Sequence, residues 1–231
     1  FGLNNFSTNA DDELKMLNYE GLSDRVLEKA DTREGQLTIA QDIMAIAESG
    51  LDFNMRFRTK RSKIDASSFV HLDLNCFLYE MECKAAKMLE IIGESTDPFR
   101  SNAEQRKALI ERYFYDKEQG IYLDYNFVDD KFSEIVSAIS IYPYAYGIST
   151  DEQGLKKVLF ILEYENGVTP TPYRGEDVYY QWDYPCMWPA ATCIIYKALK
   201  RLGLYDDAKR IAEILLNSLF ISKKSLILQP V

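Results

Sequence analysis

Apolar residues recur at helical spacing along almost the whole of this chain, and that pattern restricts the possible folds more than any other feature. The clearest stripe covers residues 74–92 and ends at Gly93, a residue typical of helix C-termini. A second stripe covers residues 37–47 and is followed by Gly50. The same periodicity predicts helices over residues 98–114, 132–146, 151–164, 186–202 and 205–219. About eight helices with short connections predict an all-α protein of layered or toroidal form.

Two segments interrupt the helical pattern. The stretch "DKEQGIYLDYNF" contains Gly120 and a short alternation of apolar and polar residues, which predicts a small β-hairpin near residues 120–127. Residues 165–185, "ENGVTPTPYRGEDVYYQWDYP", form the longest irregular region. Irregular segments of this length in a compact domain are usually functional or disordered, and four tyrosines and a tryptophan argue against disorder.

Composition excludes several classes of partner and of protein. The net charge of −9 would repel a phosphate backbone, so we expect no nucleic-acid partner. No apolar run approaches the ~18 residues of a membrane span, and the first residues lack the basic-then-apolar order of a secretory signal. The four cysteines form two pairs spaced by seven residues, and we expect them to be reduced and buried. These features predict a cytoplasmic protein, with no metal site built on its single histidine.

Asp52 is the first candidate for chemistry. It follows the predicted end of a helix near Gly50, where the negative end of the helix dipole should raise the pKa of a carboxyl group. A carboxyl with a raised pKa suits a general acid that protonates a glycosidic oxygen. From spacing alone, a turn aspartate bonded to nearby backbone is the more common explanation of such a residue.

The stretch "YYQWDYPCMW", residues 179–188, is the second candidate, and it contains both tryptophans of the chain. Aromatic rings stack on the apolar face of a pyranose, and Gln and Asp side chains bind sugar hydroxyls. The alternative is that Trp182 and Trp188 only close the end of a helical core.

Four segments of the chain, in order, resemble the motifs of trehalases, glycoside hydrolase family 37. "QWDYPCMWPA" resembles the signature Gln-Trp-Asp-x-Pro-x-x-Trp, and "AESGLDFNMRF" resembles the segment "ESGWDFSSRW", with Leu51 in place of tryptophan. "VHLDLNCFL" resembles "VPVDLNAFL", and "YFYDKEQGIYLDYNF" resembles the hairpin "WDxxxGxYxDY". The resemblance extends from about residue 18 to 220, and four ordered motifs are far more specific than any one of them.

The resemblance implies an (α/α)6 toroid that hydrolyses α,α-trehalose with inversion and needs no cofactor. Asp52 matches the general acid of the family, and a second carboxylate would activate water from the opposite side, about 6.5–9.5 Å away. The positions that match the sugar-binding motifs, or that lie near the site, are Gln181, Trp182, Asp183, Trp188, Asn75, Arg56 and, more weakly, Glu20.

The sequence also departs from the family pattern. No acidic residue follows Glu213, so the position of the catalytic base is unmatched, and about eight helices are fewer than the twelve of a complete toroid. We therefore expect residues 1–231 to form a single partial domain with an atypical tail at 221–231, and exposed helix faces that favour a homo-oligomer. Without its base, this polypeptide is expected to turn over little or no trehalose. Two alternatives stay open: a glycosidase related to family 63 that acts on another α-linked sugar, and a non-catalytic sugar-binding protein.

Overall fold

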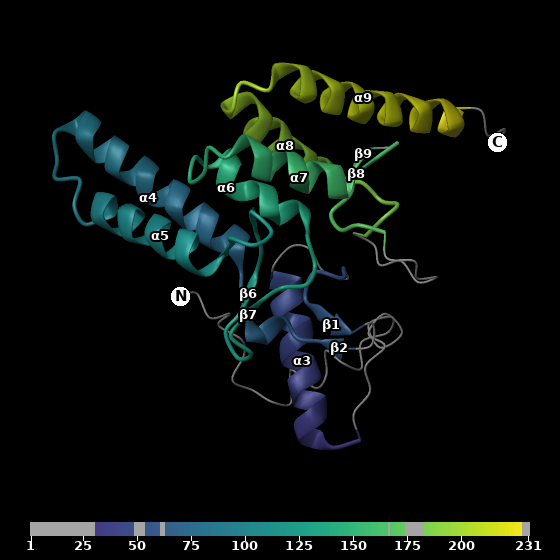
Figure 1. The fold of residues 1–231 in the computed structure, drawn as a ribbon, viewed down its shortest axis with the longest axis horizontal. Helices are drawn as coiled ribbons and strands as arrows, with labels where there is room; N and C mark the ends of the chain where they lie inside the picture. Colours follow the sequence, from purple (N-terminus) through teal and green to yellow (C-terminus); the bar gives the residue numbers. More distant parts are fainter. Residues whose placement is uncertain (1–30, 49–53, 61–62, 166, 174–182, 228–231) are drawn as a thin grey trace.

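The protein is seen here as a computed structural model that describes residues 31–48, 54–60, 63–165, 167–173 and 183–227 (Figure 1). Seven α-helices lie within these residues. They are α3 (Arg33–Glu48), α4 (Leu72–Ile92), α5 (Phe99–Tyr113), α6 (Tyr142–Ala145), α7 (Glu152–Leu162), α8 (Pro189–Arg201) and α9 (Tyr205–Ile227). Two 3-10 helices, η1 (Ala66–Ser68) and η2 (Ala138–Ile141), complete the helical elements of this part of the chain.

The predicted helices at 37–47, 74–92, 98–114, 151–164 and 186–202 are confirmed within a few residues at each end. The helix predicted at 205–219 is also confirmed, but it ends eight residues later than predicted, at Ile227. Local chemistry explains some of these ends. Gly93 ends α4 in the left-handed conformation at φ 77°, and the Asp151 side chain accepts a hydrogen bond from the amide of Gln153 at the start of α7. The last helix, α9, continues through the first residues of the segment predicted to be an atypical tail.

The prediction of a helix over residues 132–146 is wrong. Only η2 and the single turn of α6 are helical there, and Ser133 instead accepts the amide of Ile135 at 3.1 Å in a local turn. Ile139 and Ile141 are almost fully buried, as are the neighbouring residues. A short segment that is apolar because it is buried on all sides cannot be distinguished from a helix by periodicity.

The predicted hairpin belongs to two separate sheets. Strands β4 (Tyr115–Asp116) and β5 (Ile121–Tyr122) pair around Gly120, whose φ is 67°. Strand β6 (Tyr125–Asn126) instead lies between β3 (Phe69–Val70) and β7 (Lys131–Phe132). The remaining strand pairs are β1 (Arg58–Lys60) with β2 (Lys63–Ile64), and β8 (Glu163–Tyr164) with β9 (Gly167–Val168).

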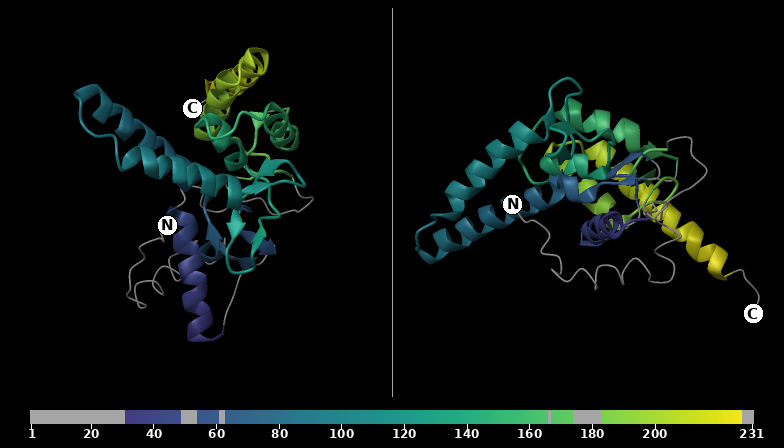
Figure 2. Two further views of the ribbon diagram at one scale, coloured as in Figure 1. Left: turned by 60° about the vertical axis from the view of Figure 1, so that its left-hand side comes forward. Right: turned by 90° about the horizontal axis from the view of Figure 1, so that it is seen from below.

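Two clusters of buried apolar side chains hold the fold together. The larger cluster takes residues from α4 to α9 and the strands between them, and it includes Tyr142 and Tyr144, whose position near a helix end predicts packing rather than a pocket lining. The smaller cluster joins α3 to Phe57 and Phe69. Helices α4 and α5 run side by side as one arm that extends from α6–α8, while α3 lies below and α9 lies over α8 (Figures 1 and 2).

Several large apolar side chains of this arm are exposed. Exposed side chains of α4 include Phe77, Met81, Met88, Ile91 and Ile92. None of the described helices combines the length and the apolar composition that a bilayer crossing requires.

All four cysteines fall in the described part of the chain and are free thiols. The prediction that they are buried holds only in part, because Cys76 is buried whereas Cys186 and Cys193 are exposed. Cys186 precedes α8 and lies in a loop, so the spacing of seven does not mark one helix face there.

Candidate functional site

A buried turn at residues 54–57 connects the first part of the chain to the larger core. The Asn54 side chain accepts a hydrogen bond from the amide of Arg56 at 2.8 Å and so fixes the turn locally. Both Asn54 and Arg56 are 1% exposed. Asp52, the predicted general acid, comes two positions earlier in the sequence and lies outside the described residues.

Arg56 holds two carboxylates in the interior. Its Nη1 and Nη2 donate to the two oxygens of Asp73 at 2.9 and 2.8 Å, and its Nε and Nη2 donate to the two oxygens of Asp124 at 2.7 and 2.8 Å. Asp73 lies in the first turn of α4, and Asp124 lies between β5 and β6. One guanidinium therefore joins three segments of the chain by bidentate pairs, which are the strongest and most directional ion pairs in proteins.

The two aspartates are held further by the backbone. Asp124 accepts the amide of Leu72 at 3.0 Å, and Asp73 accepts the amide of Leu74 at 3.0 Å, so each carboxylate also binds the start of α4. Burial by itself favours the protonated form of Asp73, but Arg56 outweighs this effect and the pKa of Asp73 is lowered. Burial likewise opposes the charge of Arg56, and Asp124 and Asp73 raise the pKa of Arg56. Arg56 and Asp73 are therefore ionised.

His71 lies against this cluster at the N-terminal end of α4. Its ring stacks on Phe57 with the centroids 4.6 Å apart, and its side chain makes no capping hydrogen bond. Burial first, and the charge of Arg56 second, lower the pKa of His71. The position of His71 beside a helix start predicts a structural role, and its neutral, stacked ring agrees with that prediction.

Asp183 forms the contact that links the two halves of the candidate site. Its Oδ1 accepts the amide of Met55 at 3.0 Å, across 128 positions of sequence, and also accepts the hydroxyl of Thr171. The carboxylate is buried, at 5% exposure. The segment that follows Asp52 in sequence is thereby bonded to the segment that follows Trp182.

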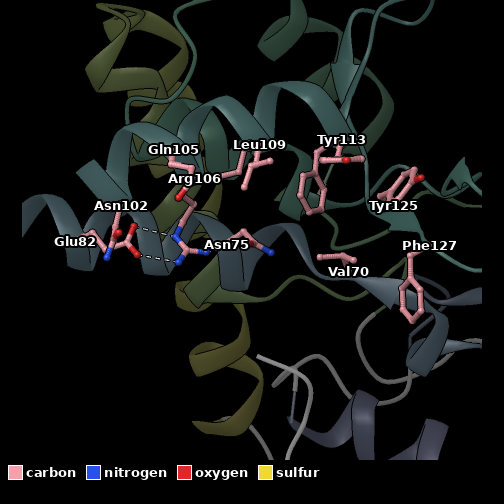
Figure 3. Close-up of a pocket in the computed structure, with 12 residues that line it drawn as sticks. Val70, Asn75, Glu82, Asn102, Gln105, Arg106, Leu109, Tyr113, Tyr125 and Phe127 are labelled. Carbon is pink, nitrogen blue, oxygen red and sulfur yellow. Dashed lines mark hydrogen bonds and ion pairs between the residues drawn. The ribbon is translucent and has the colours of Figure 1, made fainter. Parts of the chain in front are cut away.

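Asn75 lines a cavity between α4 and α5. Asn75 donates to the backbone oxygen of His71 at 2.8 Å and accepts from Arg106 of α5 at 3.2 Å. Arg106 also makes a bidentate pair with Glu82, which Figure 3 shows bridging α4 and α5. The cavity has a volume of about 630 Å³, and its lining is polar near Arg106 and aromatic near Tyr113. This size is typical of a small-molecule site.

The trehalase family model matches this chain over residues 8–225. The chain belongs to the trehalase family.

Solved structures with a similar fold agree with this membership. Neutral trehalase Nth1 from Saccharomyces cerevisiae superposes with a TM-score of 0.68 and 23% identity, over 89% of this chain and 39% of that one. The GH63 mannosylglycerate hydrolase from Thermus thermophilus, in complex with glucose, superposes with a TM-score of 0.57 and 12% identity, over 90% of this chain and 49% of that one. The likenesses confirm the predicted helical-toroid fold class. The chain spans about two fifths to one half of the length of these proteins.

The predicted site residues of this family member divide into two groups. Asp52, Gln181, Trp182 and Glu20 lie outside the described residues. Arg56, Asp183 and Asn75 are buried, and Trp188 is the half-buried residue that precedes α8 and packs against the larger core. Arg56 belongs to the 54–57 turn, and Asp183 binds the same turn through the amide of Met55. Asn75 instead faces the cavity between α4 and α5.

Three residues of the site were not predicted. Asp73 and Asp124 belong to the motif segments "LDLN" and "LDY", but nothing in the sequence pairs them with Arg56. Thr171 belongs to the irregular segment 165–185, and no motif singles it out. Within the described part of the chain, no group of three metal-ligating side chains converges.

Proposed function

We propose that this chain is the part of an inverting glycoside hydrolase that carries the general acid and one side of the sugar pocket, with α,α-trehalose as substrate. Asp52 protonates the bridging oxygen, and Gln181, Trp182 and Trp188 line the sugar pocket. Membership of the trehalase family supports the reaction class. The proposal assigns the base to no residue of this sequence.

The observation that carries the proposal is the hydrogen bond from the amide of Met55 to Asp183. Inverting hydrolysis requires a proton donor on one face of the glycosidic bond and a binding surface that holds the sugar beside it. The acid segment and the "QWD" segment are far apart in sequence, and this buried bond supports their forming one site. The Arg56 cluster supports it further, because it holds the same turn rigid.

Asp52→Asn is the direct test of the acid. Glucose release from trehalose is measured with the purified chain at high concentration, and the variant should reduce the rate by at least ~100-fold, as expected for loss of a general acid. Arg100→Met, on the exposed surface of α5, is the control and should leave the rate unchanged. An Asp52→Asn rate equal to that of the unmodified chain would remove Asp52 from this role.

A related glycosidase activity on another α-linked sugar is the second candidate. The likeness of the fold to the GH63 mannosylglycerate hydrolase favours it, as does Leu51 in place of the tryptophan of the family segment. A panel of α-linked disaccharides and glucosyl or mannosyl glycerates separates the two, since the first proposal predicts the highest kcat/KM for trehalose. Binding of trehalose in calorimetry without any hydrolysis would instead support a sugar-binding protein.

A further inference from the structure

We infer that Asp183 and Thr171 act together as positioning residues for the acid segment, and that Asp183 serves this purpose rather than binding sugar. The inference rests on the proposed function, because it assigns how the acid is held in place. It replaces the expectation that Asp183 is a substrate ligand and adds Thr171, which no motif indicates.

The first step of the argument is the geometry at Asp183. A single oxygen, Oδ1, accepts both the Met55 amide and the Thr171 hydroxyl. Met55 lies three positions after Asp52, the proposed general acid, in the sequence. Because the Asp183 side chain is almost fully buried, its bonds are shielded from competition with water.

The second step is the anchoring of Thr171. Its backbone oxygen accepts the hydroxyl of Thr169 at 2.8 Å, and the amide of Thr169 donates to Leu162 at the end of α7 at 2.9 Å. Between the two threonines, the oxygen of Pro170 accepts the amide of Ala138 in η2 at 2.8 Å. The segment 169–171 is therefore fixed to the larger core at both α7 and η2, and Thr171 extends that rigid frame to the Asp183 carboxylate.

The third step is the local rigidity of the turn that receives the bond. Met55 lies between Asn54, which caps the turn, and Arg56, whose guanidinium is held by two carboxylates. Met55 is therefore restrained on both sides within the turn, and its bond to Asp183 adds a restraint at residue 55 itself. A displacement of about 1 Å at a reacting group can reduce a rate by ~100-fold.

The test replaces the Thr171 hydroxyl by a methyl group and keeps the shape of the side chain. Thr171→Val removes the donor to Asp183, Thr171→Ser keeps it, and Thr38→Val on the exposed surface of α3 makes the same chemical change elsewhere. Thr171→Val should lower kcat for glucose release from trehalose by about 10- to 100-fold and change KM by less than about threefold. Thr171→Ser should restore most of the rate, and Thr38→Val should match the unmodified chain.

A rise in KM with kcat unchanged would overturn the inference, because it would show that Asp183 and Thr171 contact the sugar. Equal loss in Thr171→Ser and Thr171→Val would also overturn it. Urea denaturation of each variant, followed by circular dichroism, verifies that the rates refer to folded protein.

A second readout separates this inference from the proposed function. Amide hydrogen exchange of Met55, measured by NMR, should be at least ~10-fold faster in Thr171→Val and close to the unmodified rate in Thr171→Ser. If the unmodified chain releases no glucose, the proposed function fails. The exchange rate of the Met55 amide still tests whether Thr171 and Asp183 hold Met55 in place. Unchanged exchange of Met55 in Thr171→Val would overturn the inference.

Discussion

Replacement of Arg56 by methionine tests the buried cluster that supports the candidate site. Arg56→Met keeps a flexible apolar side chain of similar length and leaves Asp73 and Asp124 buried without their cation. Removing one partner of a buried ion pair costs about 3–5 kcal/mol, because the remaining charge stays desolvated. That loss is a large fraction of the roughly 5–15 kcal/mol by which domains are typically stable.

Urea denaturation followed by circular dichroism measures the loss. With an m-value of about 3 kcal/mol/M, the unfolding midpoint of Arg56→Met should fall by roughly 1–1.7 M urea at neutral pH. The control is Arg100→Met, which removes an exposed pair with Glu90 at 3.6 Å between side chains that are 55% and 63% exposed. This control should change the free energy of unfolding by less than about 0.5 kcal/mol.

The pH dependence of the loss provides a sharper version of the same test. In the unmodified chain the pKa of Asp73 is lowered, so its contribution to stability is present above the unfolded pKa of about 3.9 and is lost as pH falls through the folded value. In Arg56→Met the pKa values of the buried carboxyls should be raised. As pH falls, the folded variant should therefore bind protons at a higher pH than the unfolded chain. The difference in unfolding free energy should therefore be largest at neutral pH and narrow toward about pH 4. A loss below about 1 kcal/mol at neutral pH, or one that does not narrow in acid, would refute the reasoning.

Two further predictions concern single residues. The pKa of His71 is lowered in the folded state, so the unfolded chain binds a proton at a higher pH than the folded chain does. The free energy of unfolding should therefore decrease as pH falls below about 6.5. His71 is the only histidine in the sequence, so His71→Gln should remove this slope between about pH 7.5 and 5.5, and a flat profile in the unmodified chain would contradict it. Gly154→Ala should destabilise by about 1–3 kcal/mol in thermal melts despite the helix propensity of alanine, since a Cβ there would lie 2.4 Å from the Tyr144 hydroxyl and 2.7 Å from a backbone oxygen. Gly93→Ala meets no neighbour but requires φ 77°, so it should cost only about 1 kcal/mol. An unchanged melting temperature of Gly154→Ala would contradict the steric argument.

Helical periodicity was sufficient to predict the long helices, but it did not identify their buried faces. Helix α4 illustrates this: its stripe begins at residue 74 and Gly93 ends the helix in a conformation that glycine adopts without strain, yet Phe77, Met81 and Met88 of the stripe are exposed. Residues 132–146 show where the same signal fails. Ser133 lies in a local turn and Pro143 lies in the single turn of α6, although the run between them contains several apolar residues that are buried.

Motifs single out residues of the candidate site, but they do not identify its long-range contacts. Arg56 was singled out by its motif, but its partners lie 17 and 68 positions away, and no local spacing identifies them. The role of Asp183 shows the same limit, since its sequence neighbours suggest sugar binding while its buried contacts include Met55 and Thr171. Burial and partner identity are properties of the fold, and spacing along the chain reports neither.

The stereochemistry of trehalose hydrolysis tests the central claim most directly. Proton NMR of the first turnover products, recorded before mutarotation, distinguishes the anomers of the glucose released. The unmodified chain is expected to be slow, and inverting attack assisted by the Asp52 carboxyl should make the little glucose that it releases at high protein concentration an equal mixture of the α and β anomers. Asp52→Asn should release almost none. Release of α-glucose alone, or an equal yield from Asp52→Asn, would contradict the account.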